Sequence, residues 1–196
     1  MAEQRRSDRR VVYTKRVLRE ALVKLLRTNH ISEITITSIC ELADINRSTF
    51  YLHYRDQYDL LHQIEDEVLR EVRNRMVVVQ EELDENAAWR PVTHEMMLAV
   101  LEYTKENHEL SLVLFGGNCD FSFREDVLKV LKEIIPFPKV PLSKSMIDMI
   151  MTHAINGGID LLVRWINDGA VEDPRVIADL ILKLAYSGTT SFNPGG

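Results

Sequence analysis

The sequence predicts an all-α protein in which a three-helix head is joined by one long helix to a larger helical body. Three observations support this prediction. Apolar residues recur at helical spacing along most of the 196 residues. Residues 35–61 contain two short helical patterns separated by a tight break. A further apolar period then runs from Asp56 to about Leu83, which is long for a helix of a globular protein.

The first predicted helix follows a basic segment. Residues 1–10 contain four arginines and no apolar side chain after Ala2, so we expect a flexible basic arm. Such an arm either contacts nucleic acid or is an ordinary frayed terminus. From residue 11 onward, charged positions separate apolar residues at helical spacing. These apolar residues are Val17, Leu18, Ala21, Leu22, Leu25 and Leu26.

The second predicted helix begins near Thr35. Thr35 or Thr37 can cap its start, and Ser38 with Glu41 has the spacing of a capping box. The apolar residues of this helix are Ile36, Ile39, Cys40, Leu42 and Ala43. Asp44-Ile45-Asn46 then breaks the period, and its residue types tolerate turn conformations.

The third predicted helix opens at Arg47 or Ser48 and has a polar outer surface. Phe50 and Tyr54 lie four residues apart, so they share one face and are expected to pack inward. The side chains on the other faces can donate hydrogen bonds, and they are Arg47, Ser48, Thr49, Tyr51 and His53. A short exposed helix with this chemistry suits the major groove of DNA.

These residues together resemble the helix-turn-helix of the TetR family of bacterial transcriptional regulators. The family pattern is a Thr-led helix, an Ala-Gly-Val-type turn, a Ser-x-x-Phe/Tyr-Tyr-x-His-Phe helix, then Lys/Asp and Leu-Leu. The matching residues are Thr35, Ala43-Asp44-Ile45, Ser48 to Tyr54, Arg55-Asp56 and Leu60-Leu61. Asp44 stands where the family usually has Gly, so the turn either bends differently or holds Asp44 in a left-handed conformation. Gln57 stands where a Lys commonly grips phosphate.

The resemblance implies a DNA-binding surface on the motif and on the start of the long helix. The residues expected there are Thr35, Thr37, Arg47, Ser48, Thr49, Tyr51, His53, Arg55 and Gln57. The charge distribution agrees, because residues 1–55 hold 11 Lys and Arg against 6 Asp and Glu. The rest of the chain holds 13 against 24, so the protein is expected to touch phosphate with one end only.

The head is assigned to residues 11–55 and the body to residues 56–186. The body helices after the long one are expected over 89–115 (as one or two helices), 123–135, 143–168 and 173–186. Gly157-Gly158 lies inside one of them, which indicates the close approach of another backbone. Residues 187–196 are expected to be a disordered tail.

In TetR-like proteins the last two long helices pair with their copies in a four-helix bundle, so the resemblance implies a homodimer. The residues expected at the interface are Ile155, Gly158, Leu161, Leu162, Trp165, Ile177, Leu180, Ile181 and Leu184. The body also resembles the regulators of dihydroxyacetone kinase operons, through residues 117–123, 157–159, 165–169 and 173–174.

The resemblance also implies a small-molecule pocket among the long helix and the next three helices. The residues that could line it are Trp89, Met96, Met97, Tyr103, Phe115 and Phe121. A stripe of Met and aromatic residues at helical spacing equally fits ordinary packing, and we expect most of these residues to be core.

Several classes of function have no signature in the sequence. It contains no Gly-rich phosphate loop, no Gly-x-Ser-x-Gly and no His-Glu-x-x-His, and its histidines lack metal-binding spacing. We therefore expect no enzyme activity, no cofactor and no metal. No apolar run approaches the length of a membrane span and the Arg-rich start is unlike a signal peptide, so we expect a cytoplasmic protein.

The combined expectation is a ligand-responsive repressor that binds a palindromic operator as a homodimer. The alternative is a TetR-like helical module that acts through a protein partner as a co-activator, with weak or no DNA binding of its own. Asp44 and Gln57 favour that alternative, and a DNA titration at two salt concentrations separates the two.

Overall fold

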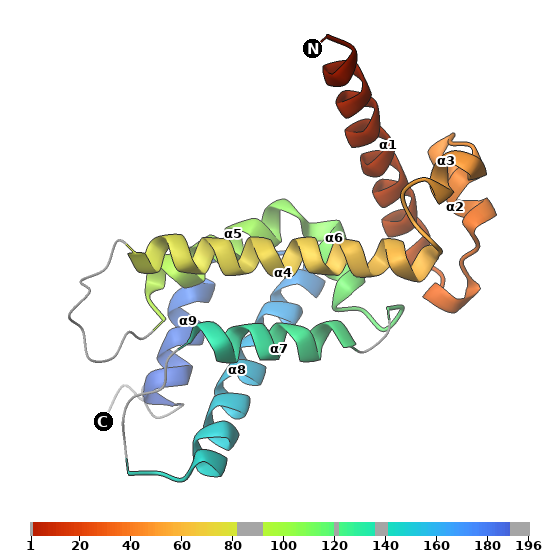
Figure 1. Ribbon diagram of the computed structural model, residues 1–196. Coiled ribbons are helices and arrows are strands. Elements are labelled where there is room, and N and C mark those ends of the chain that lie inside the picture. The colour runs from red at the N-terminus through yellow and green to blue at the C-terminus, as the bar shows by residue number, and fades with distance from the viewer. Residues whose placement is uncertain (1, 82–91, 120–121, 136–140, 189–196) are drawn as a thin grey trace. The chain divides into compact units, whose positions relative to one another are not determined.

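The computed structural model describes residues 2–81, 92–119, 122–135 and 141–188, and every regular element among these residues is helical (Figure 1). The α-helices are α1 (Ala2–Leu26), α2 (Ile36–Ala43), α3 (Arg47–Tyr51), α4 (Gln57–Glu81), α5 (His94–Glu106), α6 (His108–Leu114), α7 (Ser122–Ile134), α8 (Lys144–Asn167) and α9 (Pro174–Ser187). A short 3-10 helix, η1, covers Ile31–Glu33. The all-α prediction is confirmed, and the tail expected over 187–196 lies outside the described residues apart from its first two.

The chain divides into two compact units. The first consists of residues 1–68 together with 113–123, and the second consists of residues 69–112 and 124–196. The first unit is larger than the head predicted over 11–55, because it includes the first half of α4 and the connection between α6 and α7. Local periodicity cannot reveal that the connection between α6 and α7 belongs to the first unit, since it lies far in sequence from the rest of that unit.

Helix α1 begins at Ala2, so residues 2–10 are helical and not the flexible arm that we predicted. This segment has no Gly or Pro, and its Ala, Glu, Gln and Arg residues are good helix formers. Further along, the side chains of Leu18, Leu22 and Leu26 are almost completely buried, as the apolar period predicted.

Helix α2 begins at an N-cap formed by Thr35 and not by Thr37. The Thr35 hydroxyl accepts a hydrogen bond from the backbone N–H of Ser38 at 3.1 Å, and the Ser38 hydroxyl accepts one from the backbone N–H of Thr35 at 3.2 Å. The capping box therefore joins Thr35 to Ser38, and the pairing of Ser38 with Glu41 was wrong. Ser38 lies one turn inside the helix, where its oxygen reaches back to the cap.

Helix α2 ends at Asp44, which is held in the left-handed conformation with φ 53° and ψ 45°. This is one of the two outcomes expected for an aspartate at a position where glycine is usual. The turn leads into an N-cap at Asn46, whose side-chain oxygen accepts from the backbone N–H and the hydroxyl of Ser48, both at 2.9 Å. Asp44 therefore preserves a sharp turn at the cost of backbone strain, which is about 1–2 kcal/mol for most L-residues.

We expect Asp44→Gly to raise the free energy of unfolding by up to about 1 kcal/mol, because glycine adopts this φ without a Cβ clash. Asp44→Ala is the matched control, since it also removes the carboxylate but keeps the Cβ. It should be less stable than the glycine variant by about 1 kcal/mol. Denaturant titration followed by circular dichroism measures both, and equal stability of the two variants would show that the turn stores no strain.

The core of the second unit lies where α4, α5 and α7 meet. Its buried centre consists of Met76, Val92, Met96 and Ile134. Helix α9 packs closely against α5, and the Tyr186 hydroxyl at its end donates a hydrogen bond to the carbonyl of Val92 at 3.2 Å. These contacts cross between helices that are far apart in sequence, so they give the unit its compactness.

Helices α8 and α9 also pack against each other, which changes the assignment of the dimer interface. Five of the expected interface residues are buried inside the protomer, namely Ile155, Leu162, Trp165, Ile177 and Ile181. The partly exposed ones are Gly158, Leu161, Leu180 and Leu184. An apolar stripe on a helix does not by itself show whether it packs against a helix of the same chain or of a second copy. The assignment of the five buried residues to the dimer interface is therefore corrected.

The glycine pair in α8 was predicted to mark the close approach of another backbone, and within the protomer this prediction was wrong. A Cβ added at Gly158 would lie 3.4 Å from the Ile181 side chain, and one added at Gly157 would meet no described atom within 4 Å. Neither glycine is therefore required by a neighbouring backbone among the described residues.

The prediction that no apolar run approaches the length of a membrane span is wrong for helix α8. By length and composition alone, Lys144–Asn167 is long and apolar enough to cross a bilayer, and 17% of its most apolar window is buried. A helix that packs in a protein interior or against a second copy meets the same two measures, so the finding is weak evidence for a membrane span.

Candidate nucleic-acid interface

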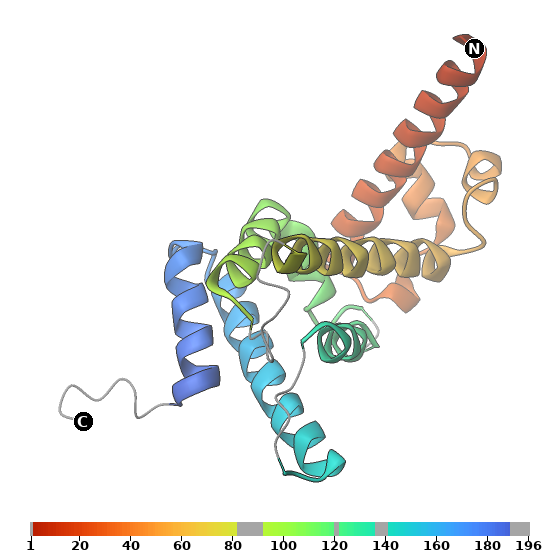
Figure 2. The same cartoon turned by 60° about the vertical axis from the view of Figure 1, so that its left-hand side comes forward.

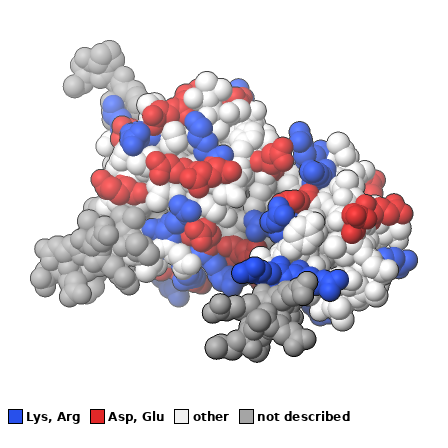
Figure 3. Space-filling model, turned by 90° about the horizontal axis from the view of Figure 1, so that it is seen from above, with Lys and Arg blue, Asp and Glu red and all other residues white. Residues whose placement is uncertain are grey.

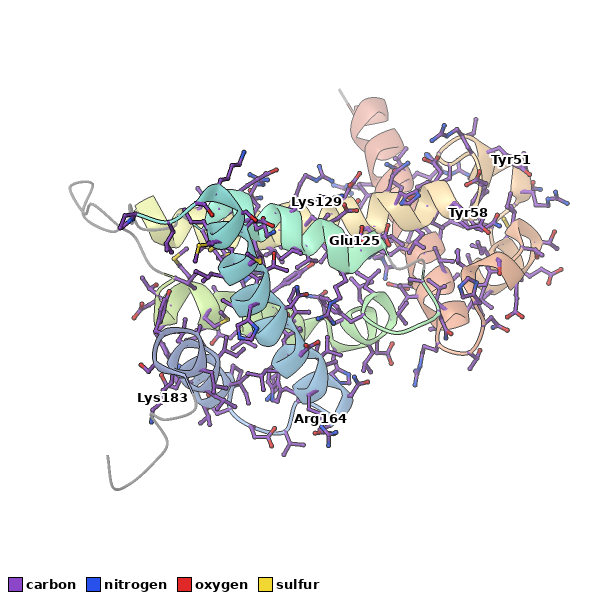
Figure 4. All side chains as sticks on the ribbon, turned by 90° about the horizontal axis from the view of Figure 1, so that it is seen from below. Tyr51, Tyr58, Glu125, Lys129, Arg164 and Lys183 are labelled. Carbon is purple, nitrogen blue, oxygen red and sulfur yellow. The ribbon has the colours of Figure 1, made fainter. Side chains whose placement is uncertain are left out.

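Two buried aromatic side chains hold α3 in place, so that its outer face is exposed. Phe50 is completely buried and Tyr54 is nearly so, with their ring centroids 5.6 Å apart. Tyr51 packs its ring edge against Phe50 at 5.8 Å and is still 52% exposed. Figure 4 shows Tyr51 at the outer surface of the first unit. The predicted burial of Phe50 and Tyr54 is confirmed, but α3 ends at Tyr51, so Tyr54 lies three residues beyond the helix and not on its inner face.

Tyr54 is held as a neutral anchor. Burial, reinforced by the nearby Glu67 carboxylate, raises the pKa of Tyr54 to about 12. The ammonium of Lys15 lies 5.9 Å from the centre of its ring, so the ring also contacts α1. A neutral ring bound on two sides leaves α3 little freedom to rotate, and this rigidity helps any readout by its outer side chains.

The residues predicted to contact DNA are mostly accessible in the structure. The exposed ones are Thr35, Thr37, Arg47, Ser48, Tyr51 and Arg55, and the partly exposed ones are Thr49, His53 and Gln57. Thr35 and Ser48 have a second role, because their hydroxyls take part in the caps of α2 and α3. Asn46 was missed as the residue that sets the start of α3, although an Asn two positions before a Ser is a recognisable capping signal.

The start of α4 adds a cation to this surface. The Arg55 side chain is 87% exposed, and its guanidinium lies 3.3 Å from the Asp59 carboxylate. The backbone N–H of Arg55 donates to the same carboxylate at 2.9 Å, and this hydrogen bond lowers the pKa of Asp59. Because the Arg55 guanidinium is exposed, its ion pair contributes little to stability, and the backbone N–H of Arg55 still binds Asp59 when the guanidinium turns to a phosphate.

A segment that the sequence did not connect to the helix-turn-helix also supports it. The side-chain amide of Asn118 donates to the carbonyl of Leu26 at 2.8 Å, and the backbone carbonyl of Asn118 accepts from the backbone N–H of Ile31 at 3.0 Å. These two bonds tie the connection between α6 and α7 to the end of α1 and the start of η1. Cys119 and Phe123 are both buried in the same unit.

The residues suggested for a small-molecule pocket do not form one group. Met96 is buried in the core of the second unit, Met97 packs against that core, and the Tyr103 ring lies 4.8 Å from the Arg75 guanidinium. Phe115 belongs to the first unit, where its ring packs against Phe123 at 5.3 Å. Trp89 and Phe121 lie outside the described residues. The described residues of this set therefore behave as packing residues.

Within the described ranges, no three His, Cys, Asp or Glu side chains are grouped so that they could hold a metal ion. The charged side chains of both signs are interspersed over the face shown in Figure 3. The exposed donors of the first unit thus remain the best candidate for a binding surface.

Comparison with known proteins gives consistent similarities along the chain. Residues 92–187 match a TetR-type family described as "Transcriptional regulator C-terminal region". YhgD, an uncharacterized HTH-type transcriptional regulator of Bacillus subtilis (strain 168), is 22% identical over 172 residues, which cover 87% of this chain and 79% of that protein.

Two solved structures share the fold. FadR from Bacillus subtilis, in complex with stearoyl-CoA, has a TM-score of 0.61 and 18% identity, covering 88% of this chain and 97% of that one. The dihydroxyacetone kinase operon activator DhaS has a TM-score of 0.53 and 19% identity, covering 88% and 93%. At this level of identity, the likeness to DhaS shows a common fold and does not single out its subgroup.

Proposed function

Because the chain belongs to the TetR family of transcriptional regulators, we propose that it binds an operator as a homodimer and that a small molecule bound in its body alters this binding. The observation that carries the proposal is the exposed face of α3. Its donors stand on a helix held by the buried Phe50 and Tyr54 rings, so they keep a fixed geometry toward base edges.

The proposal of a homodimer rests on the needs of DNA recognition and on the exposed apolar surface of α8. One head contacts too few base pairs for useful specificity, so two heads are needed. Large apolar side chains are exposed on the first turns of α8, namely Met146, Met149 and Ile150. Contact with a second copy would remove this apolar surface from water.

The proposal of an effector rests on a solved structure of the same fold. The FadR structure named above contains stearoyl-CoA, which supports a small-molecule ligand for a protein of the same fold. A ligand can change operator affinity only if it binds one arrangement of the two heads better than another. We propose that such a ligand binds among α4 and the three helices that follow it.

The experiment for the DNA-binding role is Tyr51→Ala, tested on a duplex that the wild-type protein selects from a random pool. We expect the substitution to weaken binding to the selected duplex by about 1–3 kcal/mol, the size of a lost base contact. Binding to a random duplex should change little. Fluorescence anisotropy measures both, and circular dichroism establishes that the variant is folded.

Tyr13→Ala is a control for sequence discrimination alone, because Tyr13 is another tyrosine of the first unit, is 53% exposed and lies on α1, outside the helix that reads the bases. It should leave the discrimination between the selected and random duplexes unchanged. The proposed readout by α3 is contradicted if folded Tyr51→Ala protein keeps wild-type discrimination.

The alternative function is a co-activator that acts through a protein partner with weak DNA binding. The name of DhaS, a dihydroxyacetone kinase operon activator, supports it, together with Gln57 at the position where a Lys commonly binds phosphate. The two functions differ in one measurement, because a co-activator would select no duplex from the random pool at any salt concentration.

A further inference from the structure

We infer that the exposed part of α1 over residues 9–16 forms a second DNA contact, which binds the phosphate backbone beside the site read by α3. This inference rests on the proposed function, because it assigns a further part of the chain to the same DNA partner. It concerns residues 9–16, whose side chains the structure describes, and the arginines that precede them in sequence.

The N-terminal half of α1 has little support from the rest of its unit. Five consecutive helical residues, Arg9 to Tyr13, are all exposed, and Thr14 is the first buried one. Figures 1 and 2 both show this half of α1 extending past α2 and α3. An isolated helix of this length is marginal in water, so a binding partner would stabilise it.

The protruding helix carries positive charge on the face away from the core. Arg9, Tyr13 and Arg16 are spaced four and three residues apart, so they lie on one face. The Arg16 guanidinium lies 5.5 Å from the centre of the Tyr13 ring. Arg10 adjoins this face, and Arg5 and Arg6 continue the same helical register in the sequence. The buried Thr14 and Leu18 lie on a different face.

This charge is costly for the helix itself. Like charges four residues apart on a helix repel each other, and Arg5–Arg9 and Arg6–Arg10 have this spacing in the sequence. Four arginines in the first ten residues therefore favour an anionic partner, which would offset the repulsion. Arg16 already pairs with Glu20 at 2.9 Å, whereas Arg9 and Arg10 have exposed side chains that are better placed to meet phosphate.

The helical state decides which part of the DNA is contacted. A helix with side chains is about 10–12 Å wide, whereas the minor groove is about 6 Å wide. The segment therefore cannot enter the minor groove as an extended arm would. The major groove, about 12 Å wide, is assigned to α3, so this part of α1 is left with the phosphates along the backbone, and contact with them adds affinity without sequence specificity.

The test is Arg9→Gln/Arg10→Gln in the full chain, measured against the duplex selected by wild-type protein and against a random duplex of equal length. Each lost phosphate contact should reduce the slope of log K against log salt by about 0.9, hence by up to about 3.6 for two heads. Affinity for the two duplexes should fall by the same factor, so discrimination between them is kept.

Two further variants serve as controls. Lys24→Gln removes an exposed cation of the same helix about 21 Å from Arg10, and it should leave the slope unchanged. Arg9→Lys/Arg10→Lys keeps the charges and should stay near wild type. A wild-type slope for the double Gln variant, or an equal loss for the double Lys variant, overturns the inference. If wild-type protein binds neither duplex, the proposed function fails instead.

Discussion

Protein carrying Met149→Asp is expected to be monomeric at micromolar concentration and to bind its operator at least about 100-fold more weakly than wild type. Met149 is 60% exposed on α8, and its neighbours Met146 and Ile150 are also exposed. A carboxylate buried in that apolar surface would lack a partner, which is costly. Losing the dimer also removes the avidity of two linked heads, commonly worth a factor of 10²–10⁴.

Light scattering and operator titration measure the two parts of this prediction. Val171→Asp is the matched control, because it introduces the same charge at a position that is 78% exposed in the turn between α8 and α9. It should leave mass and affinity unchanged. A wild-type mass near the 22.7 kDa of one chain would refute the homodimer. A dimeric Met149→Asp protein would refute this location for the interface.

Trp165, which the sequence placed at the dimer interface, is unsuitable for the same test. Its side chain is 3% exposed, and its indole N–H donates to the carbonyl of Glu172 at 3.3 Å. A charge there would destabilise the protomer itself. Loss of the dimer in such a variant would say nothing about the interface.

Phe50→Ala is expected to destabilise the helix-turn-helix by about 3–5 kcal/mol, the usual cost of removing a buried aromatic side chain. The Phe50 ring is completely buried and contacts the rings of Tyr51 and Tyr54. Its removal leaves a cavity beneath α3, so the outer face loses its fixed geometry. Operator binding should then be lost together with the folded head.

Denaturant unfolding and operator titration test this prediction. Phe50→Leu, which keeps most of the apolar volume, should be markedly more stable than Phe50→Ala and retain measurable binding. Tyr51→Ala separates the two roles, because it should weaken binding while the head stays folded. Wild-type stability of the Phe50→Ala protein would show that the ring does not hold α3 in place.

The sequence alone determined the features that arise from neighbouring residues. The spacing of Phe50 and Tyr54 predicted a buried pair, and both are buried. The break at Asp44-Ile45-Asn46 predicted that α3 begins at Arg47 or Ser48, and it begins at Arg47, because turn preferences act over a few positions. The left-handed Asp44 was one of two stated outcomes, because conformational preferences of a single residue are local.

Only the tertiary structure decided the features that depend on distant partners. Asn118 holds the end of α1 across 92 positions of the chain, and no local pattern indicates that bond. Ile155 and Trp165 belong to the protomer core, whereas Met149 is exposed, although all three are apolar residues of one helix. Periodicity shows that a helix has an apolar face. Which neighbour covers that face depends on contacts summed over the whole fold, and these are absent from any short window of sequence.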